Sequence, residues 1–351
     1  MSGSSFGTHF TLTTFGESHG EAVGVIIDGV TPNVEICEAD IQVQMDRRKP
    51  GQSSVTTPRK ESDTIRILSG VFEGKTTGAP LAVMLHNTDM RPAAYEKNRQ
   101  LFRPGHADFT YVKKYGHRDH RGSGRASGRE TAARVAAGAV ARKLLERREV
   151  SVTAYTKEVG GIACETFDAN EIERNVVRAA DPIAAAKMVE KIEYLSSIGD
   201  SCGGIVECII RGVDPGIGEP AFDKLDAELA KAMLSIGAVK GIEFGAGFAA
   251  SAMLGSEHND AMDSNGFHSN NAGGIVGGIS TGQDIVFRIA VKPTSSISLP
   301  QQTIDESGEE HTIETKGRHD PCICPRIVPV VEAMACLVVE DLYKRHAALH
   351  A

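Results

Sequence analysis

Short runs of β-branched and other apolar residues recur along the chain, and each is bounded by glycine, proline or aspartate. Such runs are typical of strands that bury one or both faces in a sheet. The strands expected on this basis cover Ala22–Asp28, Thr64–Leu68, Leu81–Leu85, Gly204–Arg211 and Asp284–Lys292.

Helical periodicity, with apolar residues three and four positions apart, separates these runs. Asp181 can cap the first turn of one such helix, in which proline occupies the favourable first position. The last helix is apolar on most sides, so we expect it to be buried. The four expected helices run from Pro182 to Gly199, from about Pro220 to Gly237, from near Thr131 to Leu144, and from Val330 to His346.

Long polar loops separate the apolar elements and are rich in Arg, His, Asp, Asn, Ser and Gly. Chemistry usually resides on loops that a rigid scaffold positions. We therefore expect one compact α+β domain over residues 1–351, with several functional loops converging. These loops are Asp46–Lys60, Asn87–Arg129, Glu257–Gly274 and Lys292–Pro325.

Composition narrows the class of protein. The 351 residues are 41% hydrophobic and 24% charged, as in soluble globular proteins, and no apolar run is long enough to span a membrane. The N-terminus lacks the pattern of an export signal, and the odd count of seven cysteines favours a reducing cytoplasm.

A net charge of −8 argues against nucleic-acid binding, but the first 150 residues are net basic. We expect a local cationic site.

Two glycine-rich segments resemble nucleotide-binding motifs without matching them. Gly70–Thr76 has three residues between its glycines where a P-loop needs four, and a strand-like run follows it. Gly122–Gly128 is one residue too long for the dinucleotide fingerprint. We reject both interpretations.

Gly16-Glu-Ser-His-Gly20 matches the Gly-x-Ser-x-Gly nucleophile elbow of α/β-hydrolases. That motif requires a helix after it, whereas a strand is expected here, so a hydrolase is disfavoured. The same segment holds His19 in a tight turn, and histidine is well suited to proton transfer near neutral pH. A structural role for a histidine in a turn stays open at this point.

Four arginines, Arg118, Arg121, Arg125 and Arg129, approach the expected helix at Thr131 through glycines and serines. Guanidinium groups and free N–H groups at a helix N-terminus bind anions, so we favour an anion site over a solvated basic face. Arginines also flank the nearby histidines at 117 and 120, which disfavours a metal site there.

Three further segments carry candidate chemistry. Arg103–Asp108 frames His106 with a glycine, an arginine and a carboxylate. Lys292–Ser296 leads from a strand into a hydroxyl-rich turn that can hold a phosphate. Arg318-His-Asp320 precedes a proline, and Asp320 can serve either in chemistry or as a salt-bridge partner. The neighbouring cysteines, Cys322 and Cys324, are expected to be unligated thiols.

The chain resembles the chorismate synthase family over about residues 7–345. The resemblance rests on several motifs in the same order along the sequence. They are Gly16–Gly20, Asp46–Arg48, Ser69–Lys75, Arg103–Asp108, Arg125–Thr131, Gly273–Ile279, Lys292–Ser296 and Arg318–Cys322.

That resemblance implies a β–α sandwich of the chorismate synthase type and a 1,4-anti elimination of phosphate from 5-enolpyruvylshikimate 3-phosphate, in the shikimate pathway. It also implies a requirement for reduced FMN, a homotetramer in the cytoplasm, and no metal. Whether NADPH reduces the flavin on the enzyme does not follow from the sequence. Because no reductase domain is recognisable, we expect an external flavin reductant.

The resemblance also implies roles for individual residues. The catalytic residues would be His19, as the acid that assists the departing phosphate, His106 beside the flavin, and Asp320 near flavin N5. The substrate ligands would be Arg48, Arg103, Arg129 and Arg318. The FMN contacts would be Arg125, Ala126, Ser127, Gly237, Ala238, Gly277, Lys292, Pro293, Thr294, Ser295, Ser296 and Arg318.

Three positions depart from the family pattern. Ala126 stands where serine is common, and Gly237 stands where asparagine is common, so backbone groups would make those contacts. An arginine that often follows Arg48 is missing, which leaves one substrate contact open. A flavin-storage or anion-binding protein is the non-enzymatic alternative, but it would not need two placed histidines and an aspartate.

Overall fold

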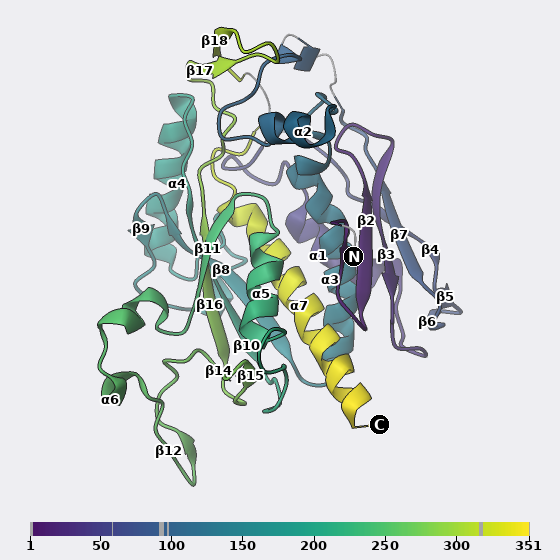
Figure 1. Ribbon diagram of the computed structural model, residues 1–351, viewed down its shortest axis with the longest axis vertical. Helices are drawn as coiled ribbons and strands as arrows, with labels where there is room; N and C mark the ends of the chain where they lie inside the picture. Colours follow the sequence, from purple (N-terminus) through teal and green to yellow (C-terminus); the bar gives the residue numbers. More distant parts are fainter. Residues whose placement is uncertain (1–2, 58, 91–94, 97, 316–318, 351) are drawn as a thin grey trace.

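Two antiparallel sheets enclose a layer of helices (Figure 1). The computed structural model describes residues 3–57, 59–90, 95–96, 98–315 and 319–350. The first sheet has the order β1 (Ser5–Phe6), β2 (Thr11–Gly16), β3 (Ala22–Asp28), β7 (Leu81–His86) and β4 (Ile65–Ser69). The second has the order β11 (Val239–Phe244), β16 (Ile285–Val291), β10 (Gly204–Arg211), β8 (Ser151–Val159) and β9 (Ile162–Ala163).

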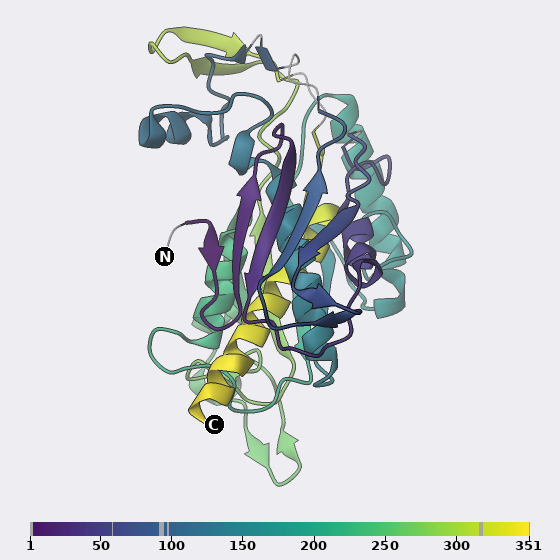
Figure 2. The ribbon, with the colours of Figure 1, turned by 90° about the vertical axis from the view of Figure 1, so that its right-hand side faces the viewer.

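The helices between the sheets are α1 (Glu38–Arg48), α3 (Thr131–Glu146), α5 (Leu225–Leu234) and α7 (Cys324–Leu349). Helix α3 packs on the first sheet, α7 packs on the second, and the two helices pack on each other (Figures 1 and 2). Their approach is so close that a Cβ on Gly138 would lie 2.3 Å from the Cβ of Ala333. The α+β sandwich expected from the sequence is confirmed.

The remaining elements are short and lie around this sandwich. The helices are α2 (Asp108–Tyr115), α4 (Pro182–Ser197) and α6 (Gly255–His258). The two-residue strands are β5 (Val71–Phe72), β6 (Lys75–Thr76), β12 (Met262–Asp263), β13 (Gly266–Phe267), β14 (Ile275–Val276) and β15 (Ile279–Ser280), and the hairpin is β17 (Gln301–Ile304) with β18 (Glu310–Ile313).

Helix α7 is buried along its first twenty residues, as its apolar sequence predicts. It begins earlier than expected and contains Pro329, which has no N–H to donate to the carbonyl of Pro325. The side chain of Arg178 supplies the missing donor, with Nη1 2.5 Å from that carbonyl oxygen. A buried arginine thus lets the helix continue through a proline.

Most sequence-predicted elements are confirmed within one or two residues, including the Asp181 cap, whose carboxylate accepts from the N–H groups of Ile183 and Ala184. The helix expected from Pro220 is wrong at its start. Helix α5 begins at Leu225 because Ala221 has a left-handed backbone with φ of 66°, and Phe222 is 93% exposed.

The segment Asn87–Arg129, expected to be a loop, contains α2. Strands β2, β8 and β11 were not predicted, since threonine, glutamate, lysine or glycine interrupts their apolar pattern. The seven cysteines are all free thiols. No helix in the described ranges combines the length and the hydropathy that crossing a membrane requires.

Candidate active site

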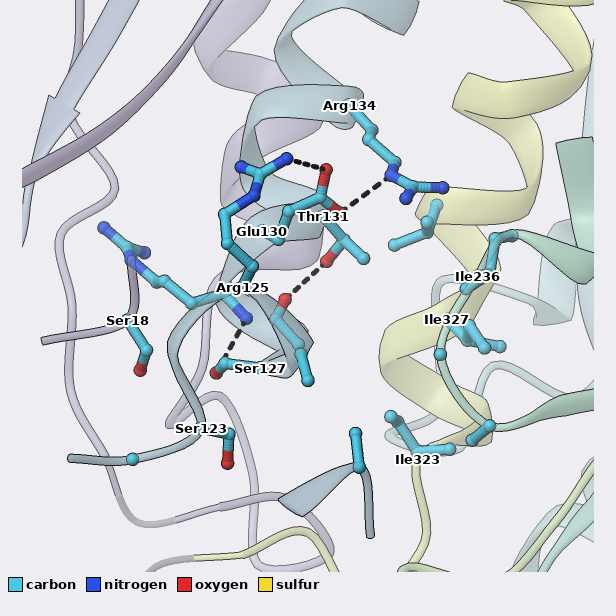
Figure 3. A pocket seen from close by; sticks show the side chains of 18 of the residues that line it. Ser18, Ser123, Arg125, Ser127, Glu130, Thr131, Arg134, Ile236, Ile323 and Ile327 are labelled. Carbon is cyan, nitrogen blue, oxygen red and sulfur yellow. Dashed lines mark hydrogen bonds and ion pairs between the residues drawn. The ribbon is translucent and has the colours of Figure 1, made fainter. Parts of the chain in front are cut away.

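A cavity of about 1180 Å³ lies where the polar loops meet the first turns of α3 and α7. Its wall at Ser123, Arg125 and Ser127 is polar, and the opposite wall presents the isoleucines at 236, 323 and 327 (Figure 3). The sequence-predicted residues that line it are His19, Arg48, His106, Arg125, Ala126, Ser127, Arg129, Gly237, Ala238, Lys292, Pro293, Thr294, Ser295, Ser296 and Asp320.

His19 lies in the loop between β2 and β3 and is 8% exposed. Its Nδ1 lies 3.2 Å from the hydroxyl of Ser18, and its ring forms a T-shaped contact with the ring of Tyr95, with 5.2 Å between the ring centroids. Gly122 packs directly on the imidazole, because a Cβ at that position would lie 2.2 Å from ring atoms. The ring is therefore held from several sides.

Asn87 connects the His19 loop to the arginine cluster. Its side-chain N–H groups donate to the carbonyls of Glu17 and Gly20 at 3.0 and 2.8 Å, which fixes both ends of the turn. Its carbonyl oxygen accepts from Nε of Arg129 at 2.7 Å. One amide thereby sets the positions of a candidate proton donor and a candidate anion ligand.

Arg48 and Arg129 share one fully buried carboxylate, that of Asp63. Arg48 reaches it at 3.0 Å and also donates to the Thr131 hydroxyl and the Gly128 carbonyl. Burial alone would raise the pKa of Asp63, but the two guanidinium charges outweigh burial and lower it. Two cations with one anion leave one positive charge that a ligand anion can neutralise.

His106 is anchored by Asp108, the first residue of α2. The ring Nδ1 lies 3.0 Å from Oδ1 of Asp108, and Arg103 donates to the same carboxylate at 2.7 and 2.8 Å. Arg118 forms a further ion pair with it at 3.0 Å. Burial lowers the pKa of His106, although its contact with Asp108 acts in the opposite direction.

Asp320 lies near the N-terminus of α7 and accepts two hydrogen bonds. The backbone N–H of Thr57 donates to Oδ1 at 2.9 Å, and Nη1 of Arg326 donates to Oδ2 at 2.6 Å. Its neighbour His319 is half-buried, and desolvation of the ring, with the charge of Arg103 nearby, lowers the pKa of His319 to about 4. The carboxylate is thus held in a defined orientation at the cavity wall.

The loop Lys292–Ser296 is tied to the His106 turn and to the α5–β11 turn. Nζ of Lys292 donates to the carbonyl of Gly105 at 2.8 Å, and its backbone N–H donates to the carbonyl of Ala238 at 2.9 Å. Ala238 has a left-handed backbone with φ of 76°. Burial and the charge of Lys240 lower the pKa of Lys292.

Some predicted residues lie away from the cavity. The guanidinium of Arg103 binds the carboxylate of Asp108 and contacts Nδ1 of His106, and Arg103 does not line the cavity. Gly277 lies in the turn between β14 and β15. Arg318 lies outside the described residues. Among the four clustered arginines, Arg125 and Arg129 line the cavity, while Arg118 pairs with Asp108 and Arg121 pairs with Asp119 at the surface.

Three cavity-lining arginines were not predicted from the sequence: Arg59, Arg134 and Arg326. Arg59 donates to the hydroxyl and the carbonyl of Ser18 and pairs with Glu61 at 2.6 Å. A usable signal existed for Arg326, because it is the lone charged residue in the first two turns of a helix that is otherwise apolar there. Arg59 lies in a polar loop, where an arginine carries no comparable signal.

Comparison with known proteins agrees with this arrangement of residues. A family model described as chorismate synthase matches residues 10–343. The chain belongs to the chorismate synthase family. Family membership makes it an enzyme of the carbon–oxygen lyase class that acts on a phosphate.

Relatives from distant organisms are similar over almost their whole length. Chorismate synthase of Syntrophobacter fumaroxidans is 56% identical over 341 residues, which cover 97% of each chain. That of Methanosarcina mazei is 55% identical over 350 residues, covering 97% of this chain and 96% of the relative. A crystal structure of chorismate synthase superposes with a TM-score of 0.77 at 30% identity, covering 97% of this chain and 93% of that one.

Proposed function

We propose that this enzyme converts 5-enolpyruvylshikimate 3-phosphate to chorismate, with reduced FMN bound in the same cavity. The observation that carries the proposal is the convergence of His19, His106, Asp320 and a net-positive arginine cluster on one cavity of about 1180 Å³. The substrate carries a phosphate and two carboxylates, and FMN carries another phosphate. Arginine clusters suit such ligands because they neutralise charge and donate in pairs.

The cavity residues fit a flavin. Ile236, Ile323 and Ile327 give one apolar wall for a planar ring system, and the opposite polar wall offers Arg125 and Ser127 (Figure 3). The hydroxyls and backbone of Lys292–Ser296 suit the phosphate and ribityl groups. When bound, the reduced flavin supplies electron density to a reaction with no net change in oxidation state.

His19 would donate a proton to the departing phosphate. The Ser18 hydroxyl accepts from Arg59 at 3.2 Å, and its second lone pair can accept the Nδ1 proton of a protonated His19 ring. The imidazolium would then donate its other proton, on Nε2, and become a neutral imidazole. A general acid at that atom lowers the barrier to loss of phosphate.

His106 would hold a proton beside the flavin. The ionised carboxylate of Asp108 can only accept a hydrogen bond, so the proton between it and Nδ1 belongs to the imidazole ring. Nε2 is then the atom that gains or loses a proton. Desolvation of this ring lowers its pKa, so the ring releases a proton more readily than a solvated histidine.

Asp320 would assist removal of the hydrogen from C6 of the substrate. Its ion pair with Arg326 and its hydrogen bond from the N–H of Thr57 hold the carboxylate in a fixed direction. Arg48 and Arg129 would supply the charge that holds the anionic substrate, and Arg125, Gly237 and Ala238 would contact FMN. Arg318 is proposed to contact both ligands, and Gly277 the flavin.

The wider setting is proposed from the family. The enzyme would work as a homotetramer of single-domain chains in the cytoplasm, without a metal, and with flavin reduced by an external reductant. Turnover with NADPH and oxidised FMN alone would instead identify an enzyme that reduces its own flavin. Both conditions are compared in one anaerobic assay.

The role of His19 is tested by kinetics. His19→Ala should lower kcat by about 10²- to 10⁴-fold, as expected for a lost general acid, with a smaller change in KM. Chorismate formation is followed by its absorbance under anaerobic conditions with photoreduced FMN. A variant in which only KM rises would remove His19 from its proposed role.

A further inference from the structure

Arg326 occupies an unfavourable position for a cation. It is the third residue of α7, at the end of a 26-residue helix where the backbone dipole is positive. Its side chain is only 13% exposed and lines the cavity. A buried guanidinium at this end of a helix needs compensation by anions.

The compensation that the described residues provide is incomplete. Asp320 accepts from Nη1 of Arg326, but its other oxygen accepts from the N–H of Thr57. Nε of Arg326 is buried and has no hydrogen-bond partner among the described residues. An unpaired buried donor on a charged group costs about 1–3 kcal/mol or more, so an acceptor is expected to approach it.

The surrounding charges add to this requirement. Arg48 and Arg129 share the single carboxylate of Asp63 and line the same cavity. Burial lowers the pKa of Arg48, and the neighbouring charges of Arg326 and Arg129 lower it further. Within the part of the chain that the structure describes, Arg48, Arg129 and Arg326 therefore pair with only two carboxylates, those of Asp63 and Asp320, which leaves an excess of one positive charge.

We propose that Arg326 is an additional oxyanion ligand of the cavity, binding a phosphate or carboxylate group of a ligand while its Nη1 holds Asp320. This inference rests on the proposed function for the identity of the ligands. It assigns to one guanidinium both the contact with the ligand and the orientation of the candidate base. It also supplies a candidate for the substrate contact left open by the missing arginine after Arg48.

The test compares Arg326→Gln and Arg326→Lys with Arg345→Gln. Arg345 is a matched control because it lies on the same helix, is 10% exposed and pairs with Asp341 at 2.7 Å. Calorimetric titration with 5-enolpyruvylshikimate 3-phosphate, spectroscopic titration with oxidised FMN, and titration with inorganic phosphate distinguish the sources of the oxyanion. Thermal unfolding verifies that each variant is folded.

We expect Arg326→Gln to weaken binding of one organic ligand by about 10- to 100-fold, as for a lost charge-assisted hydrogen bond, and Arg326→Lys to weaken it less. The ligand that is affected identifies the oxyanion. Arg345→Gln should bind within about twofold of the wild type. Unchanged affinities for both organic ligands in a folded Arg326→Gln variant would overturn the proposal.

A double variant separates ligand binding from mere pairing with Asp320. If Arg326 only neutralised that carboxylate, adding Arg326→Gln to Asp320→Asn would cause no further loss of affinity. The proposal requires a further loss of about tenfold or more. A wild-type protein that bound neither organic ligand would contradict the proposed function instead, and the phosphate titration would still test the oxyanion site.

Discussion

The imidazole of His106 shares a hydrogen bond with Asp108, with 3.0 Å between Nδ1 and Oδ1. Arg103 and Arg118 form ion pairs with the same carboxylate. Burial acts to raise the pKa of Asp108, but Arg103 and His106 together keep it well below its usual range. The acid therefore stays ionised at any physiological pH. It fixes the ring orientation and the tautomer of the histidine.

Asp108→Asn should remove this control while preserving the shape of the side chain. We expect kcat to fall by about 10- to 100-fold, because an amide can stabilise the wrong tautomer of His106. The limb of the pH–rate profile that belongs to His106 should move to lower pH, since Asp108 acts to raise the pKa of that ring. Steady-state kinetics between pH 5 and 9 measure both effects.

The same variant needs a check on folding, because Asp108 also binds two arginines. Circular dichroism and FMN titration should give values close to those of the wild type. A pH–rate profile that kept its position while kcat fell would indicate that Asp108 supports the structure of α2 rather than His106.

Gly122 offers a test of how closely His19 is held. Gly122→Ala should lower turnover by about 10²-fold, because the new Cβ would lie 2.2 Å from the imidazole and displace it. Gly116→Ala is the matched control. Gly116 has a similar left-handed backbone, with φ of 68° against 71°, but a Cβ added there would meet no neighbouring atom of the described residues within 4 Å.

Both glycine variants should lose about 1–2 kcal/mol in free energy of unfolding from the strained backbone, and Gly122→Ala should lose more because of its contact with His19. Only Gly122→Ala should lose activity per folded molecule. Equal activity in the two variants, measured at matched folded concentration, would mean that the contact between Gly122 and His19 has no catalytic consequence.

Arg129→Ala should affect binding and stability together. Substrate affinity should fall by about 10- to 100-fold, and the free energy of unfolding should fall by about 1–3 kcal/mol, because buried Asp63 loses one of its two partners. Arg121→Ala serves as the control, since that side chain is 46% exposed and pairs at the surface. Calorimetry and urea denaturation measure the two quantities. A loss of stability without a loss of affinity would make Arg129 purely structural.

The lowered pKa of His319 predicts that the stability of the folded chain depends on pH. Its pKa is about 4 in the folded chain and near 6.5 when unfolded, so the unfolded state binds more protons between these values. Stability is therefore highest above pH 6.5 and falls as the pH drops towards 4, by at most about 3 kcal/mol. His319→Gln should reduce this fall, whereas the exposed His350→Gln should not. Urea denaturation at pH 7, 5.5 and 4.5 provides the comparison.

Local sequence signals predicted the scaffold well where one physical cause dominated. The Asp181-Pro182 cap and the apolar runs of β3 and β10 locate those elements because capping and burial act within a few residues. The start of α5 was wrong because Ala221 adopts a left-handed backbone, which an alanine rarely does. The continuation of α7 through Pro329 depends on Arg178, which lies far away in the sequence.

In the candidate site, too, local motifs predicted some residues, whereas the position of others depends on the folded chain. His19 and His106 were identified from glycine-framed motifs, and both line the cavity. Arg103 and Arg129 carry the same charge in similar contexts, yet one stands behind a histidine and the other lines the cavity. That difference arises from which carboxylate each arginine meets in the folded chain, and no spacing along the sequence encodes it.

The stoichiometry of the reaction under anaerobic conditions tests the proposed function most directly. Purified enzyme receives 5-enolpyruvylshikimate 3-phosphate and a limiting amount of photoreduced FMN, and chorismate, phosphate and reduced flavin are all quantified. We predict equal amounts of chorismate and phosphate, many times the amount of flavin, with the flavin still reduced at the end. Absence of chorismate under these conditions, or equal turnover with oxidised FMN, would contradict the account.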